Sequence, residues 1–345
     1  IYGYLPILRR GTLSYIFDGA RAQYLSVPVP LSPDLTWERA QSTNIGIDLG
    51  LLKNRLTLTY DWYVRNTLDM LIPGRTLPSV YGEASPKTNA GDMQTRGWEL
   101  QVGWNDTRQL AGKPFGYSVS IGLSDYKAKI TRFDNPQGLL SNYYVGQEIG
   151  EIWGYRIAGY FKTDAEAAEY QKTVNQDFVN KQRLSAPGDW SKLQAGDIKF
   201  IDINGDGIVN NGKNTVDDHG DLVKLGNKQP RYMYGANLGA NWDGFDVSAF
   251  IQGIGKQNWY PGNNSDKFWG PYSRPYYSFI PEDFPDKVWS EENPDAYFPK
   301  LRGYVALNGG GELNVINDKY LQDLAYVRLK NLTIGYSLPA NLLSR

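Results

Sequence analysis

Apolar and polar residues alternate along most of this chain, and this pattern constrains the fold more than any other feature. Between residues 44 and 51, Ile or Leu occupies every odd position, and Asn, Gly or Asp occupies every even position. After a short turn at 52–54, the alternation resumes over 56–65. Successive side chains of a β-strand point to opposite faces, so a period of two predicts strands with two different faces. These two segments therefore predict a tight hairpin.

The same pattern predicts further strands downstream. Segments 98–104 and 117–123 alternate on either side of a loop expected near 105–114. Segments 232–242 and 245–251 are joined by Asp243-Gly244, a strong hairpin signal. A last strand at 332–338 is out of phase with the apolar residues just before it, which predicts a β-bulge near Lys330–Asn331.

Two architectures give such alternation, a soluble sandwich and a membrane β-barrel. The strands reach the roughly 9–11 residues needed to cross a bilayer, and short turns alternate with long insertions at about 66–94, 126–230 and 257–322. We therefore expect an all-β fold, part of a large antiparallel transmembrane barrel with long extracellular loops. The recognisable strands are too few to close around these loops, so we expect partner strands on another segment. Within 126–230, residues 164–184 predict a surface helix with Asp164 at its N-cap or in its first turn.

Composition excludes several classes of protein. The 36 Lys and Arg residues balance 37 Asp and Glu residues, whereas nucleic-acid binding usually needs a basic surplus. The chain has no cysteine and a single histidine, His219, which excludes thiolate sites and histidine pairs. No stretch approaches 18 apolar residues, so a helical membrane span is excluded. We do not expect this protein to be an enzyme.

Several short motifs follow one another along the chain. They are LSPDLTWERAQSTNIGIDLG at 31–50, NRLTLTYDWYVRNT at 54–67, NAGDMQTRGWEL at 89–100, GQEIGEIWGYRIAGYF at 146–161, GDIKFIDINGDG at 196–207, GNKQPRYMYG at 226–235, GFDVSAFIQG at 244–253 and YVRLKNLTIGYSLP at 326–339. The ordered set resembles the C-terminal barrel half of SusC/RagA-type TonB-dependent transporters. The resemblance covers nearly the whole of 1–345.

The resemblance implies a partial barrel of a family with about 22 strands. Such transporters lie in the outer membrane of diderm bacteria and import oligosaccharides or peptides. A SusD-like surface lipoprotein acts as their lid, and the TonB complex supplies energy through an N-terminal plug. We expect the plug, the N-terminal strands and the closing strands to be missing from this chain. Transport could then be attributed only to the parent protein.

One loop resembles the start of a calcium-binding loop. Asp202, Asn204 and Asp206 occupy positions 1, 3 and 5, and the carbonyl of Ile208 would serve at position 7. Position 12 is Lys213 rather than a bidentate acid, so an ordinary EF-hand fails. We expect a structural Ca²⁺ whose final acid comes from Asp217 or Asp218, with Asp221 as another possibility. The alternative is an Asx-rich turn without metal.

Aromatic residues are concentrated in the third insertion, where they could stack on a substrate or contact the lid. The candidates are Trp259, Tyr260, Trp269, Tyr272, Tyr276 and Tyr277. The alternative is that they pack the loop itself. Polar residues within strands could face a lumen, and we expect them to form a hydrated wall: Asp61, Arg65, Glu99, Asp246 and Lys330.

Two other functions stay open at this point. A soluble or surface calcium-binding carbohydrate-binding or adhesin module would bury the alternating apolar faces against each other. A secreted glycosidase would place paired acids in a cleft, with the acidic residues of loop 282–292 as candidates. An exposed, proline-rich acidic loop is more typical of a solvated surface. The sequence does not distinguish a glycan from a peptide substrate.

Overall fold

The computed structural model describes most of the chain in two compact units. Described residues are 7–26, 28, 30–33, 35–74, 78, 80, 82, 85–181, 192–273, 280–302, 306–307 and 311–339. The first unit comprises Ile1–Trp104, Ser124–Gln137 and Asn142–Ile149. The second comprises Asn105–Leu123, Gly138–Ser141 and Gly150–Arg345.

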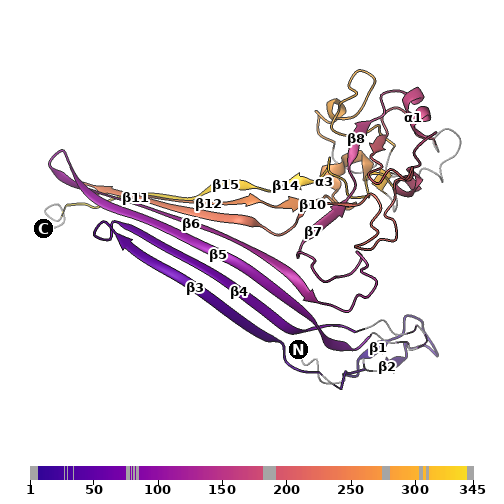
Figure 1. Ribbon diagram of the computed structural model, residues 1–345, viewed down its shortest axis with the longest axis horizontal. Helices are drawn as coiled ribbons and strands as arrows, with labels where there is room; N and C mark the ends of the chain where they lie inside the picture. Colours follow the sequence, from indigo (N-terminus) through magenta and orange to yellow (C-terminus); the bar gives the residue numbers. More distant parts are fainter. Residues whose placement is uncertain are drawn as a thin grey trace. The chain divides into compact units, whose positions relative to one another are not determined.

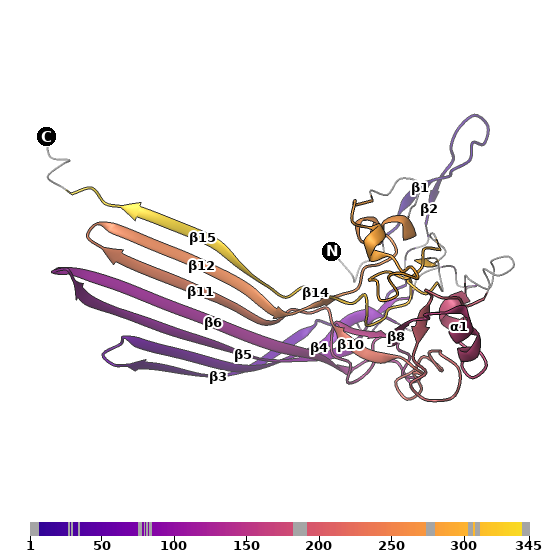
Figure 2. The same cartoon turned by 90° about the horizontal axis from the view of Figure 1, so that it is seen from above.

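Long antiparallel strands dominate the fold (Figures 1 and 2). They are β3 (Arg39–Leu51), β4 (Leu56–Pro73), β5 (Lys87–Leu110), β6 (Lys113–Arg132), β11 (Arg231–Trp242), β12 (Phe245–Lys256) and β15 (Tyr326–Tyr336). They are hydrogen-bonded in the order β15-β12-β11-β6-β5-β4-β3. Strands β3 and β15 are therefore the two edges of this sheet.

Shorter elements form separate two-stranded sheets and single helical turns. The paired strands are β1 (Arg10–Thr12) with β2 (Gln23–Leu25), β7 (Glu151–Gly154) with β10 (Val223–Asn227), β8 (Ile157–Tyr160) with β9 (Ile198–Phe200), and β13 (Asn258–Trp259) with β14 (Gln322–Asp323). The helical elements are α1 (Asp164–Tyr170), η2 (Asp177–Asn180), α3 (Asp266–Trp269), η4 (Gly270–Tyr272) and η5 (Pro285–Lys287). Among the described residues, no helix is long and apolar enough to cross a membrane.

In the first unit, the register of β3, β4 and β5 places apolar residues opposite one another. Ile45 pairs with Trp62, which pairs in turn with Trp98. The neighbouring row, on the other face, is polar and includes Asp61 opposite Glu99. The apolar row is not buried, since 60% of Ile45 is exposed. The hairpin expected between 44 and 65 is confirmed.

In the second unit, β11, β12 and β15 repeat this arrangement. Val247 pairs with both Ala240 and Ile334, and 70% of Ile334 is exposed. The turn at Asp243-Gly244 has positive φ at both residues, as expected for a two-residue hairpin turn. The β12–β15 register shifts where Phe250 faces Asn331 and Ile251 faces Leu329. The bulge predicted at Lys330–Asn331 is therefore confirmed.

Three segments differ from the sequence-based expectation. Strand β4 extends to Pro73, and strand β5 begins at Lys87. Most of the insertion expected at 66–94 is therefore strand. The loop expected at 105–114 is a tight turn at Ala111-Gly112, both with positive φ. The polar run at 105–109 hid this strand because neither of its faces is apolar.

The helix expected over 164–184 ends at Tyr170. Thr163 is its N-cap and Asp164 lies in its first turn. Beyond its end, Val174 and Phe178 pack against the core of the second unit. Residues 182–184 of the expected helix lie outside the described residues.

Beyond the Arg231 and Lys256 ends of β11 and β12, the second unit forms a compact loop domain that holds α1, α3, β7 and β8 (Figures 1 and 2). Its core is almost entirely aromatic and aliphatic, and its largest fully buried side chains include Trp269, Tyr272, Tyr320 and Phe200. Aromatic pairs such as Phe298 and Tyr320, with ring centroids 6.0 Å apart, contribute about 0.5–1.5 kcal/mol each beyond burial. The long insertions therefore fold on their own apolar core.

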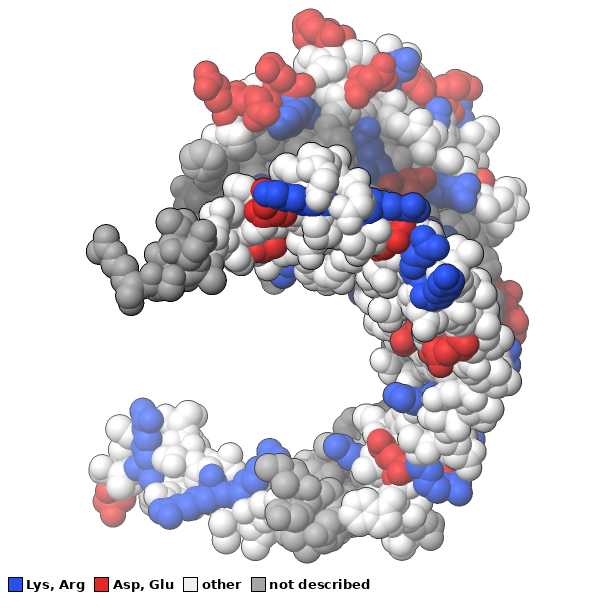
Figure 3. Space-filling view, turned by 90° about the vertical axis from the view of Figure 1, so that its left-hand side faces the viewer, with Lys and Arg blue, Asp and Glu red and all other residues white. Residues whose placement is uncertain are grey.

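Charged side chains of both signs are interspersed on the face that Figure 3 shows. Among the described residues of that face, no continuous basic surface is visible. This distribution agrees with the formal net charge of -1. It gives no support to nucleic-acid binding, which needs a clustered basic patch.

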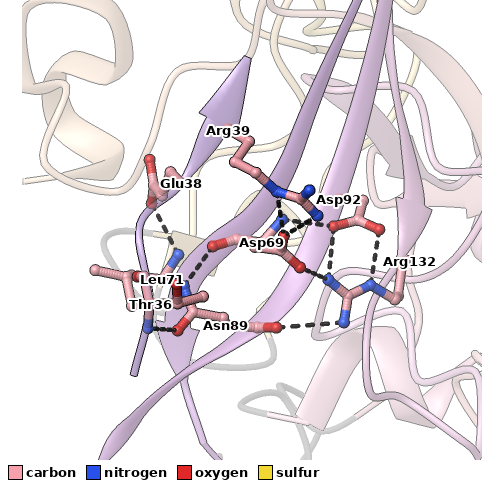
Figure 4. A network of polar contacts seen from close by, with 8 residues as sticks. All are labelled: Thr36, Glu38, Arg39, Asp69, Leu71, Asn89, Asp92 and Arg132. Carbon is pink, nitrogen blue, oxygen red and sulfur yellow. Dashed lines mark hydrogen bonds and ion pairs between the residues drawn. The ribbon is translucent and has the colours of Figure 1, made fainter. Parts of the chain in front are cut away.

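A polar network in the first unit fixes the far end of β4 (Figure 4). Asp69 has φ of 57° and lies where the β4–β5 register shifts. Arg132, at the end of β6, donates two hydrogen bonds of 2.7 Å to Asp92 and one of 2.9 Å to Asp69. Arg39 donates to the other oxygen of Asp69, and the Asn89 side chain donates to the Asp69 carbonyl. Both carboxylates are thus fully paired.

The same network holds the chain that enters β3. Asn89 exchanges hydrogen bonds with the backbone of Thr36, at 2.8 and 2.9 Å. The backbone N–H of Leu71 donates to Glu38 at 2.8 Å. A strained residue at a bulge persists only when its surroundings fix it, and these contacts do so.

We predict that Arg132→Lys destabilises the full-length protein by about 1–2 kcal/mol, because lysine cannot reproduce the bidentate contact with Asp92. Urea unfolding measures this change. Arg108→Lys is the matched control, since the side chain of Arg108 is 66% exposed where it pairs with Asp106. Its expected cost is below about 0.5 kcal/mol. Equal costs for both variants would contradict a structural role for the network.

Candidate functional site

The aromatic candidates divide into buried and exposed residues. Trp269 and Tyr272 are 0% exposed, the Trp269 indole N–H donates to the Gly262 carbonyl, and the Tyr272 hydroxyl donates to Pro299. Tyr260 is also packed against the core. Trp259, by contrast, is 40% exposed on β13. Tyr276 and Tyr277 lie outside the described residues.

The buried tyrosines of this domain are satisfied structural groups. The hydroxyl of Tyr260 lies 3.1 Å from the Leu313 carbonyl and 3.0 Å from that of Val315, and it accepts from Asn317. Burial raises the pKa of Tyr260 and of Tyr272 far above the usual value of a tyrosine. Both hydroxyls therefore stay protonated and serve as donors inside the core. Of the four aromatic candidates within the described residues, Trp259 has the ring best placed to meet a ligand.

Loop 202–221 is held by hydrogen bonds from backbone N–H groups to acidic side chains. Asp202 accepts from Gly205 and Gly207 with both of its oxygens, each at 2.8 Å. Asn204 accepts from the Asp206 N–H, and Asp206 accepts from the Ile208 N–H. Alternate side chains therefore accept hydrogen bonds from the backbone of the same loop.

Asp221 closes this loop. It is fully buried, and it accepts from the N–H groups of Ile203 and Asn204 with one oxygen and of Asn210 with the other. Asp218 instead pairs with Lys213 at 3.4 Å. Within the described part of the chain, no three His, Cys, Asp or Glu residues are grouped to hold a metal ion. Calcium at Asp202, Asn204, Asp206, Ile208, Asp217 and Asp218 stays a prediction.

The polar strand residues cover glycines on neighbouring strands. The Asp61 side chain lies over Gly46, and the Asp246 side chain lies over Gly335, so a Cβ atom at either glycine would collide with a carboxylate oxygen. Arg65 reaches Ser42 across the β3–β4 pair. Glycine and large polar residues therefore alternate across strands for a packing reason, and this face forms a polar wall.

Sequence reasoning missed a buried charged cluster in the loop domain. Asp197 receives two hydrogen bonds of 2.7 Å from Arg302, and the two side chains are 1% and 8% exposed. Glu312 lies nearby with 4% exposure and accepts from Asn180 at 3.0 Å. Asp197 and Arg302 are 105 positions apart in the sequence, and no local motif marks them or Glu312. The cluster is recognisable only from the burial of its side chains in the folded domain.

The loop 282–292 does not form a catalytic pair of acids. Asp283 pairs with Lys287 on an exposed turn, and this contact holds the pKa of Asp283 below its usual value. A glycosidase needs one carboxyl group whose pKa is raised, facing a second carboxylate. The described geometry of this loop therefore gives no support to hydrolysis.

Comparison with known proteins gives a consistent family assignment. The profile of the family described as "TonB dependent receptor-like, beta-barrel" matches residues 7–338. TonB-dependent receptor P39 of Formosa agariphila is 26% identical over 92% of this chain and 31% of its own length. TonB-dependent receptor SusC of Bacteroides thetaiotaomicron is 23% identical over 97% of this chain and 30% of its own length.

Solved structures show the same fold. The RagAB peptide importer in its open-open state aligns with a TM-score of 0.63 and 21% identity, over 99% of this chain and 32% of the other. The RagAB peptide importer in its closed-closed state aligns with a TM-score of 0.61 over 98% of this chain. The chain spans about a third of the length of these relatives. The relatives are receptors and importers rather than enzymes, and this chain belongs to the TonB-dependent receptor β-barrel family, as a barrel segment of the SusC/RagA type.

Proposed function

We propose that this chain supplies wall strands and extracellular loops to an outer-membrane importer of the SusC type. The observation that carries the proposal is the exposed apolar row on strands β3, β12 and β15, opposite a polar row of the same strands. An apolar face exposed on a sheet needs lipid, and a polar face suits a water-filled lumen. The compact loop domain suits the extracellular side, where such barrels carry their long connections.

The soluble-module alternative explains this sheet less well. It expects the apolar faces to pack against each other, yet none of the buried residues of the main core comes from β3, β12 or β15. The main cluster of buried apolar side chains belongs to the loop domain instead. A sheet with an exposed apolar face would aggregate in water unless lipid or another protein covered it.

We propose oligosaccharides or peptides as the imported class, a SusD-like lipoprotein as lid, and the TonB complex as the source of energy. The support is analogy to relatives named SusC and RagAB peptide importer. These roles would belong to the complete protein, of which this chain resembles one part. Trp259 is the exposed aromatic residue that we propose for substrate or lid contact.

The first prediction concerns the lipid-facing row. Ile334→Lys in the full-length receptor should cost about 2–4 kcal/mol if the site lies near the middle of the bilayer. Thr333→Lys, one residue away on the opposite face, should cost less than about 1 kcal/mol. Folding titrations in lipid vesicles measure both variants. A larger cost at Thr333 than at Ile334 would reverse the assignment of the two faces.

The second prediction concerns import. Cells that produce the full-length receptor with its neighbouring lipoprotein should take up labelled oligosaccharides or labelled peptides, and cells without the receptor should not. Loss of TonB should abolish the uptake while leaving the amount of receptor in the membrane unchanged. Uptake of both substrate classes that is indifferent to the receptor and to TonB would contradict the proposed function.

The third prediction concerns loop 202–221. If calcium binds there, adding calcium to the full-length protein should protect the loop from proteolysis, and Asp206→Ala should remove this protection. Glu169→Ala, at an exposed site on α1, is the control. Cleavage that is unchanged by calcium or by a chelator would leave the loop held by its hydrogen bonds alone.

A further inference from the structure

Glu312 is a buried acidic residue of the loop domain with one unsatisfied oxygen. Its Oε2 atom accepts a hydrogen bond from the Asn180 side chain at 3.0 Å. Its Oε1 atom is buried and has no hydrogen-bond partner. A buried ionised carboxylate normally needs several donors, since two oxygens offer about four acceptor positions. The hydrogen bond from Asn180 and a weaker backbone contact with Ile198 do not balance a full negative charge in this position.

The cation nearest to Glu312 is already occupied. Arg302 donates to both oxygens of Asp197, and a third contact of Arg302 goes to the Lys192 carbonyl. Asp197 also accepts from the Gln194 N–H, so it is present as a carboxylate. The net charge of the Asp197–Arg302 pair is zero. Ionising Glu312 would therefore add an uncompensated negative charge to a buried cluster.

Tyrosines supply the other titratable groups near Glu312. Tyr160, Tyr272 and Tyr320 interact electrostatically with Glu312, and each has a raised pKa that keeps it neutral. Their hydroxyl protons are directed elsewhere: Tyr160 donates to the Tyr297 carbonyl, and Tyr272 donates to Pro299. Tyr320 shares a 2.8 Å hydrogen bond with Tyr160. None of these contacts compensates a charge on Glu312.

Burial, followed by the charge of Asp197, raises the pKa of Glu312 to about 8. Arg302 and the hydrogen bonds from the Asn180 side chain and the Ile198 backbone act in the opposite direction and are the weaker influences. An exposed glutamate has a pKa of 4.5. Between about pH 4.5 and 8, the folded loop domain therefore keeps a proton on Glu312, whereas the opened domain would release it.

Glu312 also connects separate segments of the loop domain. Asn180 accepts a hydrogen bond from Gln176 at 3.0 Å, and Gln176 donates to the Ile198 carbonyl and accepts from the Phe200 N–H on β9. Asp197, just before β9, is tied to Arg302. The carboxyl group thus joins the turn at Glu312 to η2 and, through Asn180 and Gln176, to β9.

We propose that Glu312 is a proton-dependent latch, which holds η2, β9 and the turn at Glu312 together only while its carboxyl group is neutral. The direction of the pH dependence follows from the linkage between proton binding and folding. Because the folded domain binds the proton more tightly, the stabilisation is complete below about pH 4.5 and is lost as the pH rises to about 8. Alkaline conditions should therefore loosen the loop domain, and acidic conditions should close it.

Hydrogen exchange of the full-length protein tests the latch. After correction for intrinsic exchange, the opening equilibrium of amides 196–200 should rise by up to about tenfold per pH unit between pH 5 and 8. In Glu312→Gln, which is neutral at every pH, this dependence should be flat. Glu292→Gln, at an exposed site in the same domain, should keep the wild-type dependence.

Infrared spectroscopy gives a second readout that does not need a stable variant. At pH 7 the wild-type protein should show the carbonyl stretch of a protonated carboxylic acid, and the band should disappear as the pH passes about 8. Glu312→Gln should lack the band. A wild-type protein without the band at pH 7, or equal exchange slopes in wild type and Glu312→Gln, would overturn the proposal.

Discussion

The rest of the structure depends on the cross-strand register of the long antiparallel strands. Side chains alternate with a strict period of two, so one register places every apolar residue of β3, β4 and β5 on one face. Ile45, Trp62 and Trp98 form such a row, and Asp61 and Glu99 belong to the opposite face. A slip of one residue would mix both kinds of side chain on each face. The register therefore decides which surface can meet lipid and which can meet water.

The long-stranded sheet and the loop domain are stabilised by different interactions. The strands gain stability from ladders of hydrogen bonds and cover their glycines with polar neighbours such as Asp61 and Asp246. The loop domain gains stability by burying aromatic side chains such as Trp269 and Tyr320. It tolerates buried charge only where partners exist, as Arg302 shows with Asp197. Glu312 lacks such a partner for one oxygen, which is why its proton matters.

Periodicity was sufficient to predict the hairpins and even the bulge at Lys330–Asn331, because both depend on local alternation. It failed at 66–73, where the β4 register shifts around Asp69 and the pattern is lost. It also failed for the helix at 164–184, which ends at Tyr170; the chain beyond it packs Phe178 against residues distant in sequence, which local periodicity does not show. This sheet has fewer strands than the roughly 22 expected for the complete barrel. Its edges β3 and β15 are not paired to each other among the described strands.

Sites were harder to predict than strands. Irregular loops have no period, so the sequence could not distinguish Trp259, which is exposed, from Trp269, which is buried. In the same way, nothing local in the sequence brings Asp197, Arg302 and Glu312 together. The loop at 202–221 was recognisable because its acidic residues are close in sequence. The closing role of Asp221 depends on burial, which sequence spacing does not reveal.

Single-cysteine labelling along β15 measures whether alternate residues of one strand face lipid and water. This chain has no cysteine of its own, so a variant of the full-length receptor without other cysteines reports each position separately. In lipid vesicles, cysteines at Leu332, Ile334 and Tyr336 should resist a water-soluble maleimide, and a fluorophore there should be quenched by brominated lipid. A cysteine at Thr333 or Gly335 should show the opposite behaviour. Labelling without alternation, or with the two sets exchanged, would contradict the account.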